Sequence, residues 1–131
     1  MRNMKSKYNN RKVTIGKDEF DSQKEAIRYF DLLVLQRIGK IHNLERQVRF
    51  ELVPAQREPD IIGKRGGVHK GRLLEREVDY VADFVYIDDE TGEKVVEDVK
   101  GYRDPSSAGY AKFVIKRKLM LWIHGIKIRE V

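Results

Sequence analysis

The sequence predicts a small α/β domain in which helices and strands alternate around one mixed sheet. Residues 22–38 carry apolar side chains at helical spacing, with a capping residue at their start and Gly39 after them. Residues 47–53, 77–87 and 94–100 have the length and composition of strands. A second helical stretch, residues 108–123, precedes a short strand at 126–131. The predicted order is therefore helix, three strands, helix and strand, after a small N-terminal hairpin at residues 13–20.

The composition indicates one globular domain, residues 1–131, with a heavily charged surface. The chain is long enough for one core and too short for two ordinary domains. It has no cysteine, which excludes disulfides and thiolate sites and is compatible with the cytoplasm. No apolar run approaches the roughly 20 residues of a membrane span, so we expect no membrane-spanning segment, and the partner we expect is nucleic acid rather than a membrane.

The charge balance points to a polyanionic partner. The formal net charge is +6 and the pI is about 9.5. Nucleic acid is the first candidate partner and an anionic membrane surface the second, and a merely basic protein is the plain alternative. Residues 1–11 are expected to form a flexible basic arm. Residues 54–76 are expected to form a basic, glycine-containing loop, which is either ordinary surface or a flap that orders on a phosphate backbone. Four of its cations are interleaved with its glycines, namely Lys64, Arg65, Lys70 and Arg72.

The first predicted helix places an acid beside its apolar stripe. Ser22 and Glu25 have the spacing of a capping box, in which the glutamate side chain accepts a hydrogen bond from the backbone amide of the N-cap residue. This pattern alone favours capping over a chemical role for Glu25. Ile41 to Asn43 is expected to form a turn after the helix. The apolar stripe, which is typical of a helix face turned to the core, consists of Ala26, Ile27, Phe30, Leu33, Val34 and Ile38.

The stretch from Glu77 to Gly101 predicts two strands that share a cluster of charges. Asp98 and Lys100 lie two residues apart and therefore point to the same face of a strand. If the strands pair, Asp83 joins them. A buried ion pair gains little because desolvation offsets the attraction, and two carboxylates repel each other without a cation between them. The cluster therefore favours a metal-dependent site over a structural ion pair, and both interpretations stay open at this point.

The residue types suit phosphodiester hydrolysis assisted by a divalent metal. Mg²⁺ and Mn²⁺ prefer oxygen ligands, which Asp83, Asp98 and the backbone carbonyl of Val99 supply. A metal of this kind neutralises the phosphate and acidifies a bound water. Lys100 can orient or deprotonate that water, or offset charge on the phosphate. The histidines have no ligand spacing for zinc; they are His42, His69 and His124.

Asp83 followed by Asp98-Val99-Lys100 on the next strand resembles the PD-(D/E)xK nuclease superfamily, and the element order is similar to that superfamily's core. Nearly the whole chain also resembles small phage and prophage proteins regarded as Holliday-junction-resolvase-like endonucleases. The phrases that carry this second resemblance are Lys7-Tyr8-Asn9-Asn10, Phe20-Asp21-Ser22, Ala82-Asp83-Phe84-Val85-Tyr86 and Val96-Glu97-Asp98-Val99-Lys100-Gly101.

The resemblance implies roles for individual residues and a restriction-endonuclease-like fold. Asp83 and Asp98 match the metal-binding acids, Lys100 the catalytic lysine, and Glu25 the helical glutamate that is a further metal ligand in many members. This match reverses the preference for capping. Gln47 resembles a strand glutamine near the site in some branches. By alternation Glu97 faces away with Val95 and Val99, unless a bulge exchanges its role with that of Asp98. Ala82 replaces the motif's proline, and Asp98 stands where glutamate is frequent.

The implied function is an endonuclease that cuts DNA with Mg²⁺ or Mn²⁺. The relatives act on branched DNA as homodimers, which implies a phage or prophage protein of recombination or replication, in the cytoplasm of a bacterial host. The alternatives are a catalytically degenerate DNA-binding phage protein and a nicking or single-strand nuclease of the same fold. On the second helix Lys112 and Lys116 form either a solvated stripe or a contact with the DNA backbone. Further candidate DNA contacts near the site are Tyr102, Arg103 and Tyr110.

Overall fold

A mixed four-stranded sheet forms the centre of the protein, in the order β10-β9-β8-β3. The computed structural model describes residues 12–100 and 106–131; the N-terminal basic arm expected at residues 1–11 lies outside them. The strands are β3 (Ile41–Val53), β8 (Val78–Asp88), β9 (Lys94–Asp98) and β10 (Arg129–Glu130). β8 pairs antiparallel with β3 and β9, whereas β9 and β10 are parallel. Together with helices α1 (Gln23–Arg37) and α2 (Ala108–His124), these strands confirm the predicted element order and the α/β class.

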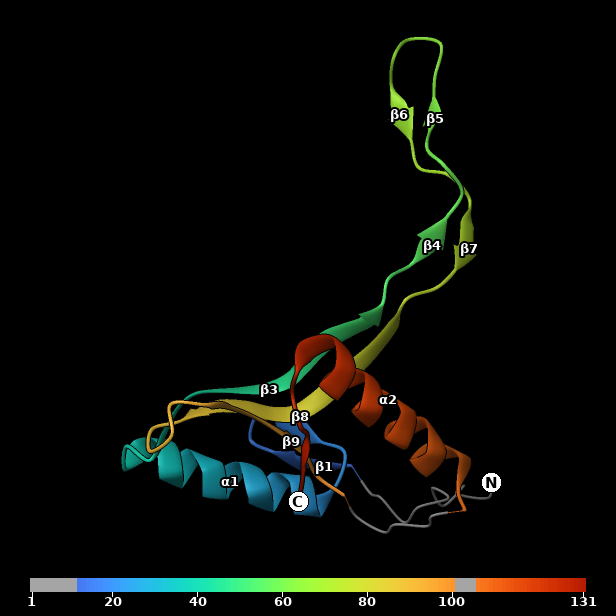
Figure 1. The fold of residues 1–131 in the computed structure, drawn as a ribbon. Helices are drawn as coiled ribbons and strands as arrows, with labels where there is room; N and C mark the ends of the chain where they lie inside the picture. The colour runs from blue at the N-terminus through green and yellow to red at the C-terminus, as the bar shows by residue number, and fades with distance from the viewer. Residues whose placement is uncertain (1–11, 101–105) are drawn as a thin grey trace.

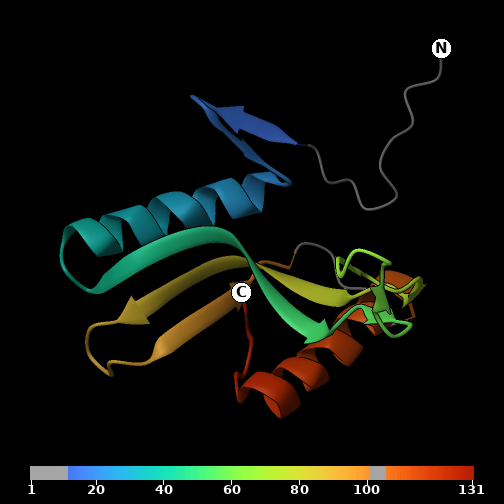
Figure 2. The ribbon, with the colours of Figure 1, turned by 90° about the horizontal axis from the view of Figure 1, so that it is seen from above.

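One helix covers each face of the sheet (Figure 2). On the α2 face, Phe113 and Met120 pack with Tyr80, Ala82 and other buried strand residues. On the α1 face, Leu32 packs with Ile41, Phe84, Tyr86 and Val95. Because β8 lies between two strands and under both helices, its apolar side chains from Ala82 to Tyr86 are buried on both sides, whereas Val78 and Val81 nearer the start of the strand are exposed.

The two helices begin and end at the residues that the sequence indicates. The Ser22 hydroxyl accepts a hydrogen bond from the Glu25 amide at 3.1 Å, and the Ser107 hydroxyl accepts one from the Tyr110 amide at 3.1 Å. Gly125 ends α2 in the left-handed conformation, with a φ of 65°. In the described part of the chain, no helix is long and apolar enough to cross a membrane.

The apolar stripe predicted for α1 does not face the core as a whole. Ala26 is buried, but the residues farther along one side of the helix are exposed, namely Ile27, Phe30, Val34 and Ile38. The sheet instead contacts Tyr29, Leu32 and Leu35. The prediction was wrong because α1 is apolar around more of its circumference than one sheet face can cover, so spacing alone does not select the buried side.

Strand β3 starts earlier than predicted, so the expected turn from Ile41 to Asn43 is wrong. Ile41 pairs with Asp88 and His42 with Ile87, directly after the Gly39 turn. A bulge follows between His42 and Glu45, where Asn43 has a φ of 55°. Polar side chains interrupt the alternation of apolar and polar residues here, so the sequence pattern does not indicate a strand. The backbone hydrogen bonds between β3 and β8 do not depend on those side chains.

The loop expected at residues 54–76 is instead a two-stranded arm, called the β-arm below. It continues from the ends of β3 and β8 and projects away from the sheet (Figure 1). Glycines and prolines interrupt its ladders, which hides the strand pattern in the sequence. The antiparallel pairs are β4 (Gln56–Arg57) with β7 (Leu73–Glu75), and β5 (Ile61–Ile62) with β6 (Val68–His69).

Two predicted hairpins are present. β1 (Val13–Ile15) and β2 (Asp18–Phe20) pair around Gly16 at the N-terminal end of the described chain. β8 and β9 are joined by an acidic turn, in which Asp88 accepts a hydrogen bond from the Glu90 amide at 2.8 Å. This turn is solvent-exposed at Asp89 and Glu90, as expected for a hairpin tip.

Candidate active site at the end of the β8–β9 ladder

Asp83 marks the point where β8 and β9 stop pairing through their backbones. The last ladder pair is Phe84 with Glu97. Beyond it, Oδ2 of Asp83 accepts a hydrogen bond from the Val99 amide at 2.7 Å. The carboxylate therefore replaces a backbone acceptor and is fixed against the end of β9, where Asp98 and Lys100 lie.

Asp98 and Lys100 form an ion pair on the α2 face of the sheet. Nζ of Lys100 lies 2.8 Å from Oδ1 of Asp98, as the spacing of two residues along a strand predicts. The other carboxylate oxygen accepts a hydrogen bond from the Tyr80 hydroxyl at 2.6 Å. The Lys100 ammonium also lies 3.4 Å from the centroid of the Phe113 ring. These contacts fix the orientation of both charged groups.

Glu25 and Gln47 approach Asp83 from the other side. Glu25 is 3% exposed, and its Oε1 accepts a hydrogen bond from Nε2 of Gln47 at 3.0 Å. The same Nε2 lies 3.4 Å from Oδ1 of Asp83. The Ser22 hydroxyl caps α1 by accepting from the Glu25 amide, while the Glu25 carboxylate is directed to the amide of Gln47 and thus toward Asp83.

Gln47 has an unusual backbone conformation for a strand residue. Its φ is 51°, in the left-handed region that residues other than glycine rarely adopt. The neighbouring pairs Arg46–Phe84 and Val48–Ala82 place Gln47 opposite Asp83. Strained backbone of this kind is found preferentially at functional sites, and here it coincides with the residue that links the two acids.

Strand β8 changes its packing partner at Asp83. Tyr80 and Ala82 pack in the α2 cluster, whereas Phe84 and Tyr86 pack in the α1 cluster. In an unbroken strand these four side chains would share one face. The change lets Asp83 lie between Glu25, which comes from α1, and Asp98, which lies on the α2 face.

Burial perturbs both acids that Gln47 contacts. Burial, followed by the charge of Asp83, raises the pKa of Glu25 to about 7. Burial also raises the pKa of Asp83 to about 6; the charge of Asp98 adds to this increase, and the hydrogen bond from Val99 opposes it. Desolvation and like charge act together here, which is the pattern of a functional site.

Glu97 lies on the opposite face from Asp98 and has a different environment. It is fully buried, and the Arg28 guanidinium donates to its two oxygens at 2.8 and 2.6 Å. The Tyr86 hydroxyl donates to it as well. The strand contains no bulge that would exchange Glu97 and Asp98 in the described ladder. The acid beside Lys100 is therefore Asp98.

The predicted metal ligands come from both sides of Asp83. The described residues contain no group of three or more histidine, cysteine, aspartate or glutamate side chains arranged to hold a metal ion. Instead Glu25 is joined to Asp83 through Gln47, and Asp98 is held by Lys100 and Tyr80. The backbone of Val99 contacts this group through its amide.

The structure separates most of the predicted DNA-binding residues from these carboxylates. Lys112 is exposed and Lys116 half-buried on α2, the helix that supplies Phe113. The β-arm, which projects from the sheet, carries Lys64, Arg65, Lys70 and Arg72 (Figure 1). Tyr102 and Arg103 lie outside the described residues. Tyr110 is half-buried against the α2 cluster.

Several site neighbours were missed in the sequence. Tyr80 and Phe113 look like ordinary core residues there, and only the packing shows that they contact Asp98 and Lys100. Lys24 donates to the backbone carbonyl of Lys100. The charge of Arg46 lowers the pKa of Glu25, against the larger effect of burial. No local pattern could reveal these contacts, because each joins residues far apart in the chain.

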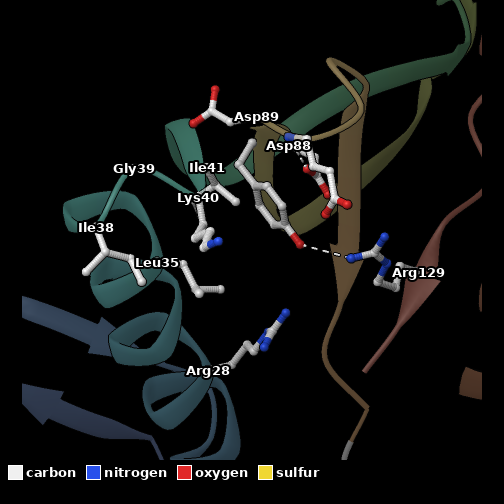
Figure 3. A pocket seen from close by; sticks show the side chains of 11 residues that line it. Arg28, Leu35, Ile38, Gly39, Lys40, Ile41, Asp88, Asp89 and Arg129 are labelled. Carbon is white, nitrogen blue, oxygen red and sulfur yellow. Dashed lines mark hydrogen bonds between the residues drawn. The ribbon is translucent and has the colours of Figure 1, made fainter.

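A separate cavity of about 580 Å³ lies beside the Arg28–Glu97 pair on the α1 face. Figure 3 shows Arg28, Lys40 and Arg129 around it, with the acids of the β8–β9 turn. Arg129 donates to the Tyr86 hydroxyl at 3.2 Å. None of Glu25, Asp83, Asp98 and Lys100 lines this cavity, so it is distinct from the candidate active site.

Comparison with known proteins identifies one family. A family model described as "Protein of unknown function (DUF1064)" matches residues 5–124. No curated protein and no solved structure matches the chain.

Proposed function

We propose that this chain, which belongs to the DUF1064 family, is a metal-dependent endonuclease that hydrolyses phosphodiester bonds in DNA. The observation that carries the proposal is the position of Asp83 between two groups: the buried acid Glu25, which is linked through Gln47, and the Asp98–Lys100 pair. The resemblance of these residues to the PD-(D/E)xK motif supports it. The observed element order agrees with a restriction-endonuclease-like core, which we propose as the finer fold assignment.

The carboxylates suit a hard divalent cation. Burial and the charges of neighbouring acids raise the pKa values of Glu25 and Asp83. A bound cation would lower both pKa values by stabilising the ionised carboxylates. Mg²⁺ and Mn²⁺ take carboxylate and carbonyl oxygens as ligands. Asp83 and Asp98 would hold the metal, with Glu25 and the Val99 carbonyl as further ligands. When bound, the metal supplies charge neutralisation at the phosphate and a more acidic water.

The remaining residues position the reacting groups. Lys100 is held by Asp98 and by the Phe113 ring, so its ammonium has a defined place from which to orient a nucleophilic water or to offset phosphate charge. Tyr80 fixes the second oxygen of Asp98. The side-chain amide of Gln47 holds the carboxylate of Glu25, on α1, next to that of Asp83, on β8. Lys112 and Lys116 on α2 would contact the DNA backbone.

We propose branched DNA as the substrate and a homodimer as the active form, both on the strength of the resemblance to resolvase-like nucleases. The net charge of +6 favours a DNA partner. The exposed stripe of α1, which includes Phe30 and Val34, offers an apolar surface for a second copy. Sedimentation of wild type and Phe30→Asp tests this: the variant is expected to be monomeric, and an unchanged dimer would exclude α1 as the interface. On the same resemblance we propose that the protein is encoded by a phage or prophage and acts in the cytoplasm of the host.

Cleavage assays with Mg²⁺ on branched and linear DNA test the proposal. Asp83→Ala, Asp98→Ala and Lys100→Ala are each expected to abolish cutting and to leave the circular dichroism spectrum unchanged. Glu90→Ala removes an exposed acid at the β8–β9 turn and is the matched control. Normal cutting by all three variants would overturn the site. Salt-sensitive binding without cleavage in any metal would favour the degenerate DNA-binding alternative, and cutting confined to single strands or nicks would favour the nicking nuclease.

Calorimetric titration with Mn²⁺ tests the metal separately from activity. Wild type is expected to bind the ion, and Asp98→Ala to bind it much more weakly. Unchanged binding in the variant would remove Asp98 from the proposed ligand set.

A further inference from the structure

The β-arm is a built element rather than a loose loop. At its base the Glu58 amide donates to the Arg72 carbonyl at 2.9 Å, and the Arg57 guanidinium donates to the Gly71 carbonyl at 3.0 Å. Gly71 is buried, and a Cβ at this position would lie 2.0 Å from the Glu58 carbonyl oxygen. Near the tip the Gly63 amide donates to the Gly67 carbonyl at 2.7 Å. The two halves of the arm are thus held together along its length.

The outer part of the β-arm has one sign of charge. Beyond the Ile61–His69 pair the chain contains the cations Lys64 and Arg65 and no acid, and Lys70 and Asp60 lie next to that pair, one beside each strand. Arg72 pairs with Glu58 at the base, so the outward cations are Lys64, Arg65 and Lys70, all exposed. A surface of this kind attracts a polyanion and repels another copy of itself.

The same part of the β-arm exposes large aliphatic side chains. Ile62 and Val68 are directly paired across the ladder and therefore share one face. They are 75% and 66% exposed, because the ribbon has no second layer to cover them. Phosphate contacts alone do not bury such groups. A partner must therefore offer both phosphates and an apolar surface, which the grooves of duplex DNA do through base edges and thymine methyl groups.

We propose that the β-arm seats its tip in the major groove of duplex DNA, at a distance from the bond that is cut. Ile62 and Val68 lie against base edges, while Lys64, Arg65 and Lys70 contact phosphates along the groove walls. A two-stranded ribbon fits the major groove, about 12 Å wide, and does not fit the minor groove, about 6 Å wide. The inference rests on the proposed function for the identity of the polymer.

The length of the β-arm sets where this contact falls. Its outward path, residues 54–65, spans at most about 40 Å at about 3.3 Å per residue. One helical turn of DNA is about 34 Å. The tip therefore reaches duplex up to about one turn away from the body of the protein, so the contact requires a duplex longer than the cleavage site itself.

Binding of the full chain to labelled DNA in EDTA, where no cutting occurs, tests the proposal. For Lys64→Ala/Arg65→Ala we expect at least tenfold weaker binding to a long duplex, with a slope of log Kd against log salt smaller by about 2. For Ile62→Ser/Val68→Ser we expect weaker binding with an unchanged slope. The control is Lys17→Ala/Arg37→Ala, which removes two exposed cations outside the β-arm and is expected to change affinity much less.

Two further measurements identify the groove and the reach. Methyl green, which occupies the major groove, is expected to compete with the wild type, and netropsin, which occupies the minor groove, is not. On a duplex of about one helical turn, the wild type and both β-arm variants are expected to bind equally. Competition by netropsin alone would overturn the assignment, as would a difference between wild type and variants that persists on the short duplex.

The outcomes separate this inference from the proposed function. If wild type cuts DNA but the β-arm variants bind as wild type does, the inference fails and the nuclease stands. If the variants lose binding as expected but no metal supports cutting, the nuclease fails and the β-arm contact stands. If Ile62→Ser/Val68→Ser changes the sedimentation of the protein without DNA, the tip is a protein interface and the inference is wrong.

Discussion

Glu25 of α1 and Asp83 of β8 share a single hydrogen-bond donor, the side-chain amide of Gln47, which lies 3.0 Å from one carboxylate and 3.4 Å from the other. Both carboxyl groups are partly removed from water and lie around one amide, so the ionisation of each is made unfavourable by burial and by the charge of a neighbouring acid. This unfavourable ionisation predicts how the free energy of unfolding depends on pH.

The metal-free protein is expected to lose stability as the pH rises from about 4.5 to about 7. The pKa of Glu25 is raised from 4.5 to about 7, mainly by burial, so in this range the folded state binds more protons than the unfolded state. Stability then falls with pH. At pH 8 the ionised Glu25 lowers the free energy of unfolding by an amount on the order of 3 kcal/mol.

Urea denaturation in EDTA at pH 5 and pH 8 measures this effect. Glu25→Gln is expected to flatten the pH dependence, whereas Glu90→Gln, an exposed acid, leaves it unchanged. Adding Mg²⁺ at pH 8 is expected to stabilise the wild type and to have less effect on Glu25→Gln. A wild type and a Glu25→Gln variant with the same pH dependence would contradict the prediction.

The left-handed φ of Gln47 predicts an ordering between two substitutions. Glycine adopts a φ of 51° without strain, whereas alanine does not. Gln47→Gly is therefore expected to be more stable than Gln47→Ala by about 1 kcal/mol, although glycine is usually the poorer strand residue. Both variants lose the amide between Glu25 and Asp83, so their cleavage rates should fall alike. Equal stability in chemical denaturation would show that the backbone here is unstrained.

Removal of the Tyr80 hydroxyl is expected to impair both stability and cleavage. In Tyr80→Phe, a buried oxygen of Asp98 loses its donor at 2.6 Å, which costs about 2 kcal/mol. Asp98 is then free to turn away from its orientation beside Lys100, and we expect slower cleavage at saturating DNA. Tyr29→Phe, on the α1 face and stacked on Phe84, is the control. A Tyr80→Phe enzyme with normal cleavage would show that Lys100 alone holds Asp98.

The Arg28–Glu97 pair is expected to support the fold and not the chemistry. Arg28→Ala leaves the buried Glu97 carboxyl without its guanidinium partner, at a cost of about 3 kcal/mol. Arg28→Ala/Glu97→Gln should lose less, because the neutral amide needs no counter-charge. Denaturation midpoints measure the difference. Cleavage per folded molecule should be unchanged in both, and a loss of cleavage in the double variant would place Glu97 in the site.

Gly71 is expected to be essential for the shape of the β-arm. Gly71→Ala places a Cβ against the Glu58 carbonyl, and the base of the β-arm must then open. Limited proteolysis should cut residues 54–76 faster in this variant. The thermal midpoint should stay close to that of the wild type, since the β-arm contributes no residue to the two core clusters. Gly67→Ala, which meets no atom within 4 Å, is the control, and equal proteolysis of the two variants would contradict the prediction.

The local elements of this protein could be predicted from the sequence because their causes are local. Ser22 and Ser107 cap helices through their own next turns, and Gly125 ends α2 by its backbone freedom. The relation between Asp98 and Lys100 follows from the two-residue repeat of a strand. The same repeat places Glu97 on the other face, as predicted.

Only the tertiary structure decided which side of each element is used. The apolar residues of α1 surround most of the helix, and the sheet selected Leu32 and left Phe30 exposed. Whether Glu25 caps its helix or approaches Asp83 depended on Gln47, a residue of another element with a strained φ. The change of face in β8 at Asp83 has no signature in its own stretch of sequence. Spacing determines which side chains share a face, but packing free energy, summed over distant contacts, determines what each face meets.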